Sequence, residues 1–238
     1  MSLAFVLSVL LVLGVVFVNG WTDAPNAIGS AVATKVLRPR SAIIVAVVFN
    51  FLGVLLMTFI STEVADTMSN MVDFGSSGSY QSLIALTAAM FAIVVWAVAA
   101  WYFGIPTSES HALIAGITGA AIALGGISAV NMKEWSKVLI GLVVSSVLGF
   151  GSGFGFARFI EKAFRWVHRQ KAESFFRKGQ AATAAGMAFL HGAQDGQKFM
   201  GVFMLALFLN GMAEKTPEGT FNIPIWVMVL CSLTMGIG

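Results

Sequence analysis

Asn19-Gly20-Trp21-Thr22-Asp23-Ala24-Pro25-Asn26-Ala27-Ile28-Gly29 is the stretch that decides the fold, because it places polar residues, glycines and a proline inside an apolar segment. Residues 3–18 carry no charge, and apolar residues resume after the stretch through Val36. An ionised aspartate and irregular backbone are costly in a bilayer unless they line a cavity or a binding site. We therefore expect a first membrane segment that is interrupted at residues 19–26.

The composition of the 238 residues is that of a membrane protein. Hydrophobic residues make up 58% and charged residues 11% of the chain, and the mean hydropathy is +0.86. Soluble domains carry about 25% charged residues. The single cysteine, Cys231, excludes an internal disulfide and a multi-cysteine metal site. Residues 1–18 lack the basic start and cleavage site of a signal peptide, so we expect the first helix to be retained.

Further apolar segments predict an all-α, polytopic membrane protein. The predicted segments are 2–37 (interrupted at 19–26), 41–60, 82–104, 111–130, 138–157, 180–212 (interrupted at 191–198) and an unfinished one from 223. Lysine and arginine concentrate in 35–40 and 158–178, which predicts that both connections are cytoplasmic and that the N-terminus lies outside the plasma membrane. We expect the second connection to be a basic loop on the anionic inner leaflet, not a nucleic-acid site.

The first interruption has a counterpart in His191-Gly-Ala-Gln-Asp-Gly-Gln-Lys198. Aligned without gaps, the two copies superpose Gly20 on Gly192, Asp23 on Asp195 and Gly29 on Gly201. The two segments are predicted to cross in opposite directions, and broken helices in inverted repeats are typical of transporters with a site at mid-membrane. We therefore expect a first inverted repeat at 1–157, a cytoplasmic loop at 158–179 and the start of a second repeat at 180–238.

A third interruption reads Ile105-Pro106-Thr107-Ser108-Glu109-Ser110-His111. A proline followed by hydroxyl side chains suits a helix N-terminus, whose free N–H groups attract anions. The alternative is an ordinary helix start that Ser108 and Ser110 cap while Glu109 faces water. A carboxylate and an imidazole at this depth favour a binding site.

These blocks resemble the inorganic phosphate transporter (PiT) family of bacterial type, whose repeated signature is close to G-A-N-D-x-x-N-A-x-G and accompanies a P-x-S-T-T-H-type motif. The resemblance covers nearly the whole chain. It implies uptake of inorganic phosphate by symport with H⁺ or Na⁺ between two inverted repeats in the lipid bilayer. It also allows a homodimer, which no residue of this chain demonstrates. The second P-x-S motif is absent up to residue 238, and 223–238 is too short to span, so we expect a truncated chain or a fragment.

The resemblance and the charge pattern together assign the expected site. Substrate binding is expected at Asn26, Thr107, Ser108, Ser110, Gln194 and Lys198. Cation coupling is expected at Asp23, Glu109 and Asp195, with Asp23, Asn26 and Asp195 as ligands if Na⁺ is the cation. Lys198 departs from the family, which has asparagine there, and we expect its ammonium to replace one Na⁺ and shift coupling towards H⁺. No resident cofactor is expected.

Other functions fit the sequence less well. Ser108, His111 and Asp195 could be imagined as a hydrolytic triad, but no nucleophile-elbow, oxyanion or zinc motif accompanies them, so we expect no enzyme. A channel needs a continuous polar pore, whereas the polar residues gather in three clusters. A permease of the same family for sulfate or another tetrahedral oxyanion stays open, as do the stoichiometry and the choice between H⁺ and Na⁺.

Overall fold

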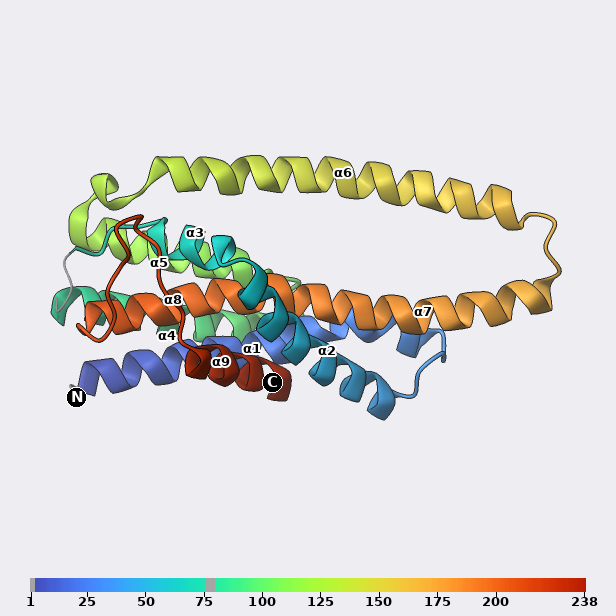
Figure 1. The fold of residues 1–238 in the computed structure, drawn as a ribbon, viewed down its shortest axis with the longest axis horizontal. Coiled ribbons are helices and arrows are strands. Elements are labelled where there is room, and N and C mark those ends of the chain that lie inside the picture. The colour runs from blue at the N-terminus through green and yellow to red at the C-terminus, as the bar shows by residue number, and fades with distance from the viewer. Residues whose placement is uncertain (1–2, 76–79) are drawn as a thin grey trace.

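The structure, a computed structural model, describes residues 3–75 and 80–238 as helices that lie side by side along one long axis (Figure 1). The elements are α1 (Leu3–Ala33), α2 (Pro39–Ile60), α3 (Glu63–Asn70), α4 (Tyr80–Phe103), α5 (Glu109–Gly125), η1 (Ile127–Ala129), α6 (Met132–Phe164), α7 (Arg169–His191), η2 (Gly192–Gly196), α8 (Gln197–Leu209) and α9 (Ile225–Ile237). Among the described residues the only β pairings are two isolated bridges. The all-α prediction is confirmed.

Several helices have the length and composition of membrane spans. Within the described residues, α1, α2, α4 and α6 are long and apolar enough to cross a bilayer, and α5 and α9 are shorter apolar helices. Each of the four longer helices contains at least the roughly 20 residues that a span needs. The prediction of a multi-pass membrane protein is therefore confirmed, while the external N-terminus stays a prediction.

The expected interruption of the first segment at 19–26 is wrong, because α1 continues through it and holds Pro25 inside the helix. The polar side chains of this stretch find partners locally. Thr22 Oγ1 donates to the Val18 carbonyl at 2.8 Å, and the Asn19 and Asn26 amides both donate to the Asp23 carboxylate. Proline is tolerated in membrane helices where side chains and neighbouring helices satisfy the freed backbone groups. The helix therefore needs no break to carry its polar residues.

The second interruption, expected at 191–198, is a single π-helical turn, η2, between α7 and α8. The three elements form a continuous helical rod that runs opposite to α1 (Figure 1). A π turn inserts extra backbone into a helix and is frequent at functional sites. The third interruption is a true break, since α4 ends at Phe103 and α5 begins at Glu109.

The basic stretch 158–178 is not a loop. It is helical except for the turn at 165–168, because α6 extends to Phe164 and α7 begins at Arg169. Rings of Phe164, Phe175 and Phe176 pack against one another across this turn, with centroids 4.7–5.4 Å apart. The α6–α7 hairpin extends beyond the α1–α2 connection (Figure 1). Its contact with the inner leaflet stays a prediction.

Glycines bring α2 very close to the α7–η2 rod. A methyl group built on Gly192 would overlap the backbone of Asn50, and one built on Gly53 would overlap the backbone of Phe189. Small residues at helix interfaces allow this close approach in membrane proteins. The contact matters for the site because it sets Asn50 of α2 beside His191 at the end of α7.

Candidate functional site

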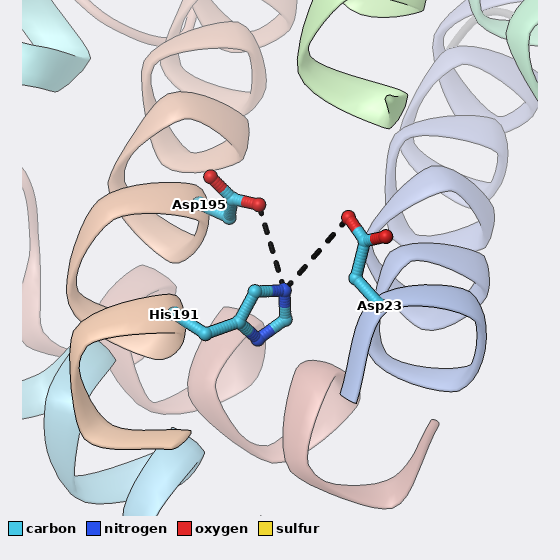
Figure 2. Close-up of side chains that lie close together, drawn as sticks. All are labelled: Asp23, His191 and Asp195. Atoms are coloured by element: carbon cyan, nitrogen blue, oxygen red, sulfur yellow. Dashed lines mark ion pairs between the residues drawn. The ribbon is translucent and has the colours of Figure 1, made fainter. Parts of the chain in front are cut away.

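Three helical segments that are distant in the sequence meet at a cluster of charged side chains in the bundle. Asp23 comes from α1, His191 ends α7, and Asp195 lies in η2 (Figure 2). His191 Nε2 lies 3.5 Å from Asp195 Oδ2 and 4.0 Å from Asp23 Oδ2, between the two carboxylates. The three side chains are only 12–17% exposed. The two aspartates that the repeat pairs thus face one histidine.

Lys198 and Ser110 close the cluster on the other side of Asp195. Lys198 Nζ lies 2.5 Å from Asp195 Oδ1 and donates to Ser110 Oγ at 2.7 Å. The Ser110 hydroxyl, in the first turn of α5, also lies 3.4 Å from Asp195 Oδ1. This arrangement ties the start of α5 to α8 through an ammonium that opposes one carboxylate. The Lys198 side chain therefore points into the cluster.

His191 is oriented by a residue of α2. Its Nδ1 lies 2.9 Å from Asn50 Oδ1, and an amide oxygen is an acceptor, so Nδ1 carries the hydrogen in this contact. In the neutral ring Nε2 is then a bare acceptor, and it has no hydrogen-bond partner within the described residues. Three electron-rich groups, Nε2 and two carboxylate oxygens, converge within 4.8 Å of one another.

A cavity of about 470 Å³ opens beside Asp23. It is lined by Thr22, Asp23, Asn26, Ala97, Ala100, Trp101, Gly104, Ile105, Pro106, Thr107 and Glu109. Glu109 is 1% exposed, and neither of its carboxylate oxygens has a hydrogen-bond partner among the described residues. Burying an unpaired carboxylate is expensive. The interpretation in which Glu109 points to water is therefore wrong.

The other expected site residues are placed as follows. Asn26 and Thr107 line the cavity, and Thr107 Oγ1 accepts a hydrogen bond from Trp96 Nε1 at 3.0 Å. Ser108 is the N-cap of α5 and accepts from the His111 amide at 3.4 Å. Gln194 is exposed on η2 and is not among the residues that line this cavity. The structure thus gathers all the expected residues except Ser108 and Gln194 at the charged cluster or the cavity.

The donor atoms of the cluster suit a cation. Carboxylate oxygens are ligands for Na⁺ and Mg²⁺, whereas an imidazole nitrogen added to them also suits first-row divalent metals. The unpaired Nε2 of His191 and the unpaired oxygens of Glu109 show that the residues present fit a positive charge at this place. Asp23, His191 and Asp195 would hold it, and it would offset the repulsion between the two carboxylates.

The site expected from the sequence left out three residues of the cluster: His191, which begins the second polar block, Asn50 and Asn19. Asn50 is the only amide in α2 and lies between two phenylalanines, and a lone amide in an apolar segment is the signal that could have found it. Asn19 opens the decisive stretch, and its Nδ2 donates to Asp23 Oδ2 at 3.0 Å. Its buried Oδ1 has no partner in the described part of the chain.

Known proteins share this arrangement of sequence and fold. A sequence model described as the phosphate transporter family matches residues 19–238. A probable low-affinity inorganic phosphate transporter of Bacillus subtilis (strain 168) is 37% identical over 241 residues, which cover 100% of this chain and 70% of the relative. One of Mycobacterium tuberculosis (strain ATCC 25618 / H37Rv) is 35% identical over 224 residues, which cover 93% of this chain and 51% of the relative.

Among solved structures, one described as the sodium-dependent phosphate transporter superposes with a TM-score of 0.85 at 20% identity, covering 99% of this chain and 74% of the other. That likeness shows the fold. The chain spans about half the length of the mycobacterial relatives that it matches. The match of the family model over nearly the whole chain, together with the 37% identity to a relative of which it covers 70%, shows that this chain belongs to the phosphate transporter family.

Proposed function

We propose that the chain serves as a secondary transporter that takes up inorganic phosphate by symport with a cation. The observation that carries the proposal is the convergence of Asp23, Ser110 and Asp195, from three distant segments, on one buried charged cluster beside a cavity. Family membership and the names of the relatives support phosphate as the substrate. The absence of an enzyme motif from the sequence supports transport rather than catalysis.

The phosphate would lie at the start of α5. The first N–H groups of a helix have no intrahelical partner and attract anions. Ser110 and Thr107 add hydroxyl groups there, and Lys198 Nζ is within hydrogen-bonding distance of Ser110 Oγ. These are the donors that phosphate oxygens accept from. Lys198 would contribute charge as well as a hydrogen bond.

Cations must accompany the phosphate for electrostatic reasons. Asp23, Glu109 and Asp195 outnumber Lys198, so a phosphate dianion would enter a site that already has an excess of negative charge. Moving one charge against 100 mV costs about 2.3 kcal/mol, and a dianion faces about twice that. Na⁺ or H⁺ bound at Asp23, Asp195 and Glu109 would compensate both terms. The sodium dependence named for the structural neighbour supports Na⁺ as one candidate.

Phosphate uptake by the purified chain in proteoliposomes tests the proposal. The Na⁺ gradient and the pH gradient are imposed separately, and Asp23→Asn and Asp195→Asn are compared with the unmodified chain. We expect uptake that depends on at least one gradient and falls by at least about tenfold in each variant, because each removes a charge that a cation would neutralise. Full, gradient-independent uptake in both variants would remove these carboxylates from the mechanism.

Sulfate is the second candidate substrate. It has the same shape and charge as the phosphate dianion but carries no proton to donate near neutral pH, and the unpaired Glu109 carboxylate is a group that could accept one. We therefore expect phosphate to be preferred. The competition experiment adds unlabelled sulfate to the uptake assay, and equal displacement by sulfate and phosphate would contradict the choice of substrate.

The arrangement of the chain in the membrane is part of the same proposal. We place the N-terminus outside and the α6–α7 hairpin inside, supported by the basic residues at 35–40 and 158–178. Residues 1–157 and 180–238 would belong to two inverted repeats, supported by the opposite directions of α1 and the α7–η2–α8 rod (Figure 1). Protease cleavage at the hairpin in right-side-out vesicles would contradict this orientation.

A further inference from the structure

Asn50 is an amide in a place where an amide has no evident packing reason. It lies in the middle of α2 between Phe49 and Phe51, and it is 1% exposed. Its backbone packs directly against Gly192 of η2, and a side chain at position 192 would overlap it. A buried amide needs hydrogen-bond partners to offset the loss of water. The partner that the structure provides is the ring of His191.

The direction of this hydrogen bond decides what His191 presents to the charged cluster. Asn50 Oδ1 is an acceptor 2.9 Å from His191 Nδ1, so Nδ1 donates. The neutral ring then turns an unprotonated Nε2 towards Asp195 Oδ2 and Asp23 Oδ2. Without an acceptor at Nδ1, the proton is free to reside on Nε2, and the ring would present an N–H to the carboxylates instead of a lone pair.

We propose that Asn50 is a positioning residue that holds His191 in the Nδ1–H tautomer and thereby makes Nε2 the third ligand, with Asp23 and Asp195, of the coupling cation. This inference rests on the proposed cation site and adds a residue to it. In metal sites the second ring nitrogen of a ligating histidine commonly donates to such a partner, which fixes the tautomer and the ring orientation. Loss of such partners typically lowers metal affinity by about 10–100-fold.

A purely structural role for Asn50 makes a different prediction. If the amide only fills space between α2 and η2, its replacement should change stability and leave the ligand set of a bound cation unchanged. The two roles therefore separate when the acceptor oxygen and the volume are changed independently. Asn50→Asp keeps an oxygen that accepts from Nδ1–H, whereas Asn50→Leu keeps a similar volume and removes the acceptor.

Thr58→Val is the matched control for loss of a buried polar group on the same helix. Thr58 is 3% exposed, and its hydroxyl donates to the Val54 carbonyl of α2 and to Met200 Sδ of α8, neither of which is a residue of the cluster. The double variant Asp23→Asn/Asp195→Asn gives the level of cation binding expected when the proposed cation site is lost. Thermal unfolding in detergent identifies any variant that fails to fold.

The experiment measures cation binding to the detergent-purified chain without transport. Radiolabelled Na⁺ is followed by equilibrium dialysis, and Mn²⁺ is followed by electron paramagnetic resonance. The spin-echo modulation of bound Mn²⁺ reports directly whether an imidazole nitrogen is a ligand. We expect Asn50→Leu to lower the affinity by about 10–100-fold and to lose the nitrogen modulation. Asn50→Asp and Thr58→Val should keep both.

Three results would overturn the inference, and they are distinguishable. Asn50→Leu that binds the cation as the unmodified chain does, with the same nitrogen modulation, removes the role of Asn50 while the site itself stands. If neither ion binds the unmodified chain more tightly than the double variant Asp23→Asn/Asp195→Asn, the cation site of the proposed function is refuted. Asn50 then has no cation ligand to position. Loss of binding in Asn50→Asp equal to that in Asn50→Leu would also contradict the tautomer argument.

Discussion

Replacing Gly192 with alanine should damage the site without touching any of its functional groups. The added methyl would lie 2.8 Å from Asn50 Cα, whereas carbon atoms pack best at about 3.5–4.0 Å. The methyl carbon is fixed directly to the backbone of η2 and Asn50 Cα belongs to the backbone of α2, so relief requires α2 and η2 to separate by about 1 Å. Overpacking of this kind costs about 1–3 kcal/mol of folding free energy.

The same movement acts on the site through His191. The hydrogen bond from Nδ1 to Asn50 Oδ1 is 2.9 Å long, and an increase of about 1 Å takes it beyond hydrogen-bonding distance. A displacement of this size in a site can lower its activity by about 10²-fold. We therefore expect Gly192→Ala to reduce phosphate uptake in proteoliposomes by about that factor and to lower the unfolding temperature in detergent.

Gly186→Ala is the matched control on α7. A methyl group on Gly186 meets no atom within 4 Å, so this change should preserve uptake and favour the helix by up to about 1 kcal/mol. Wild-type uptake and stability in Gly192→Ala would refute the reasoning. So would equal losses in the two variants, since only one of them forces helices apart.

Three further predictions concern single charged residues. Glu109→Gln should raise the unfolding temperature in the absence of cations, because it removes a buried unpaired carboxylate. It should also reduce the increase in unfolding temperature that added Na⁺ produces. An unchanged Na⁺ effect in differential scanning fluorimetry would contradict this prediction. Lys198→Asn, which introduces the residue found at the aligned position Asn26, should make phosphate uptake depend more steeply on Na⁺, and an identical Na⁺ titration would count against Lys198 as a substitute cation. Burial in the connection before α9 lowers the pKa of the Lys215 ammonium in the folded chain. The unfolded chain therefore binds the Lys215 proton more tightly than the folded chain does. The free energy of unfolding should rise as the pH increases from that lowered pKa to the ordinary lysine range. Lys215→Met should remove this rise, and an unchanged pH profile of thermal unfolding would disprove it.

The sequence predicts the helices well because each apolar run is long and bounded by charge, proline or glycine. The prediction of an interruption at 19–26 was wrong because the polar side chains there find their partners within the helix. Asn19, Thr22 and Asn26 satisfy polar groups within the helix, and composition alone does not distinguish such self-contained polarity from a break. The basic stretch at 158–178 was expected to be a loop because charge marks where a chain leaves the bilayer, not where its helix ends.

The alignment of the two polar blocks pairs Asp23 with Asp195, and the structure places them on either side of one histidine (Figure 2). Their binding role stays a prediction. Asn50 could not be paired with His191 from the sequence, because the contact depends on a close approach that Gly53 and Gly192 permit. A glycine-rich segment indicates that another helix packs closely against it, but it does not identify that helix. That part of the site required three-dimensional coordinates.

The net charge of the empty site makes its movement across the membrane sensitive to the membrane potential. With all three carboxyl groups ionised and His191 neutral, Asp23, Glu109 and Asp195 exceed Lys198 by two negative charges. In a carrier that opens to each side in turn, a potential negative inside favours the outward-facing empty site by up to about 2.3 kcal/mol per charge for each 100 mV. A loaded site whose cations balance both the phosphate and these two charges moves almost independently of voltage. The step that the potential accelerates is then the return of the empty protein rather than the entry of phosphate.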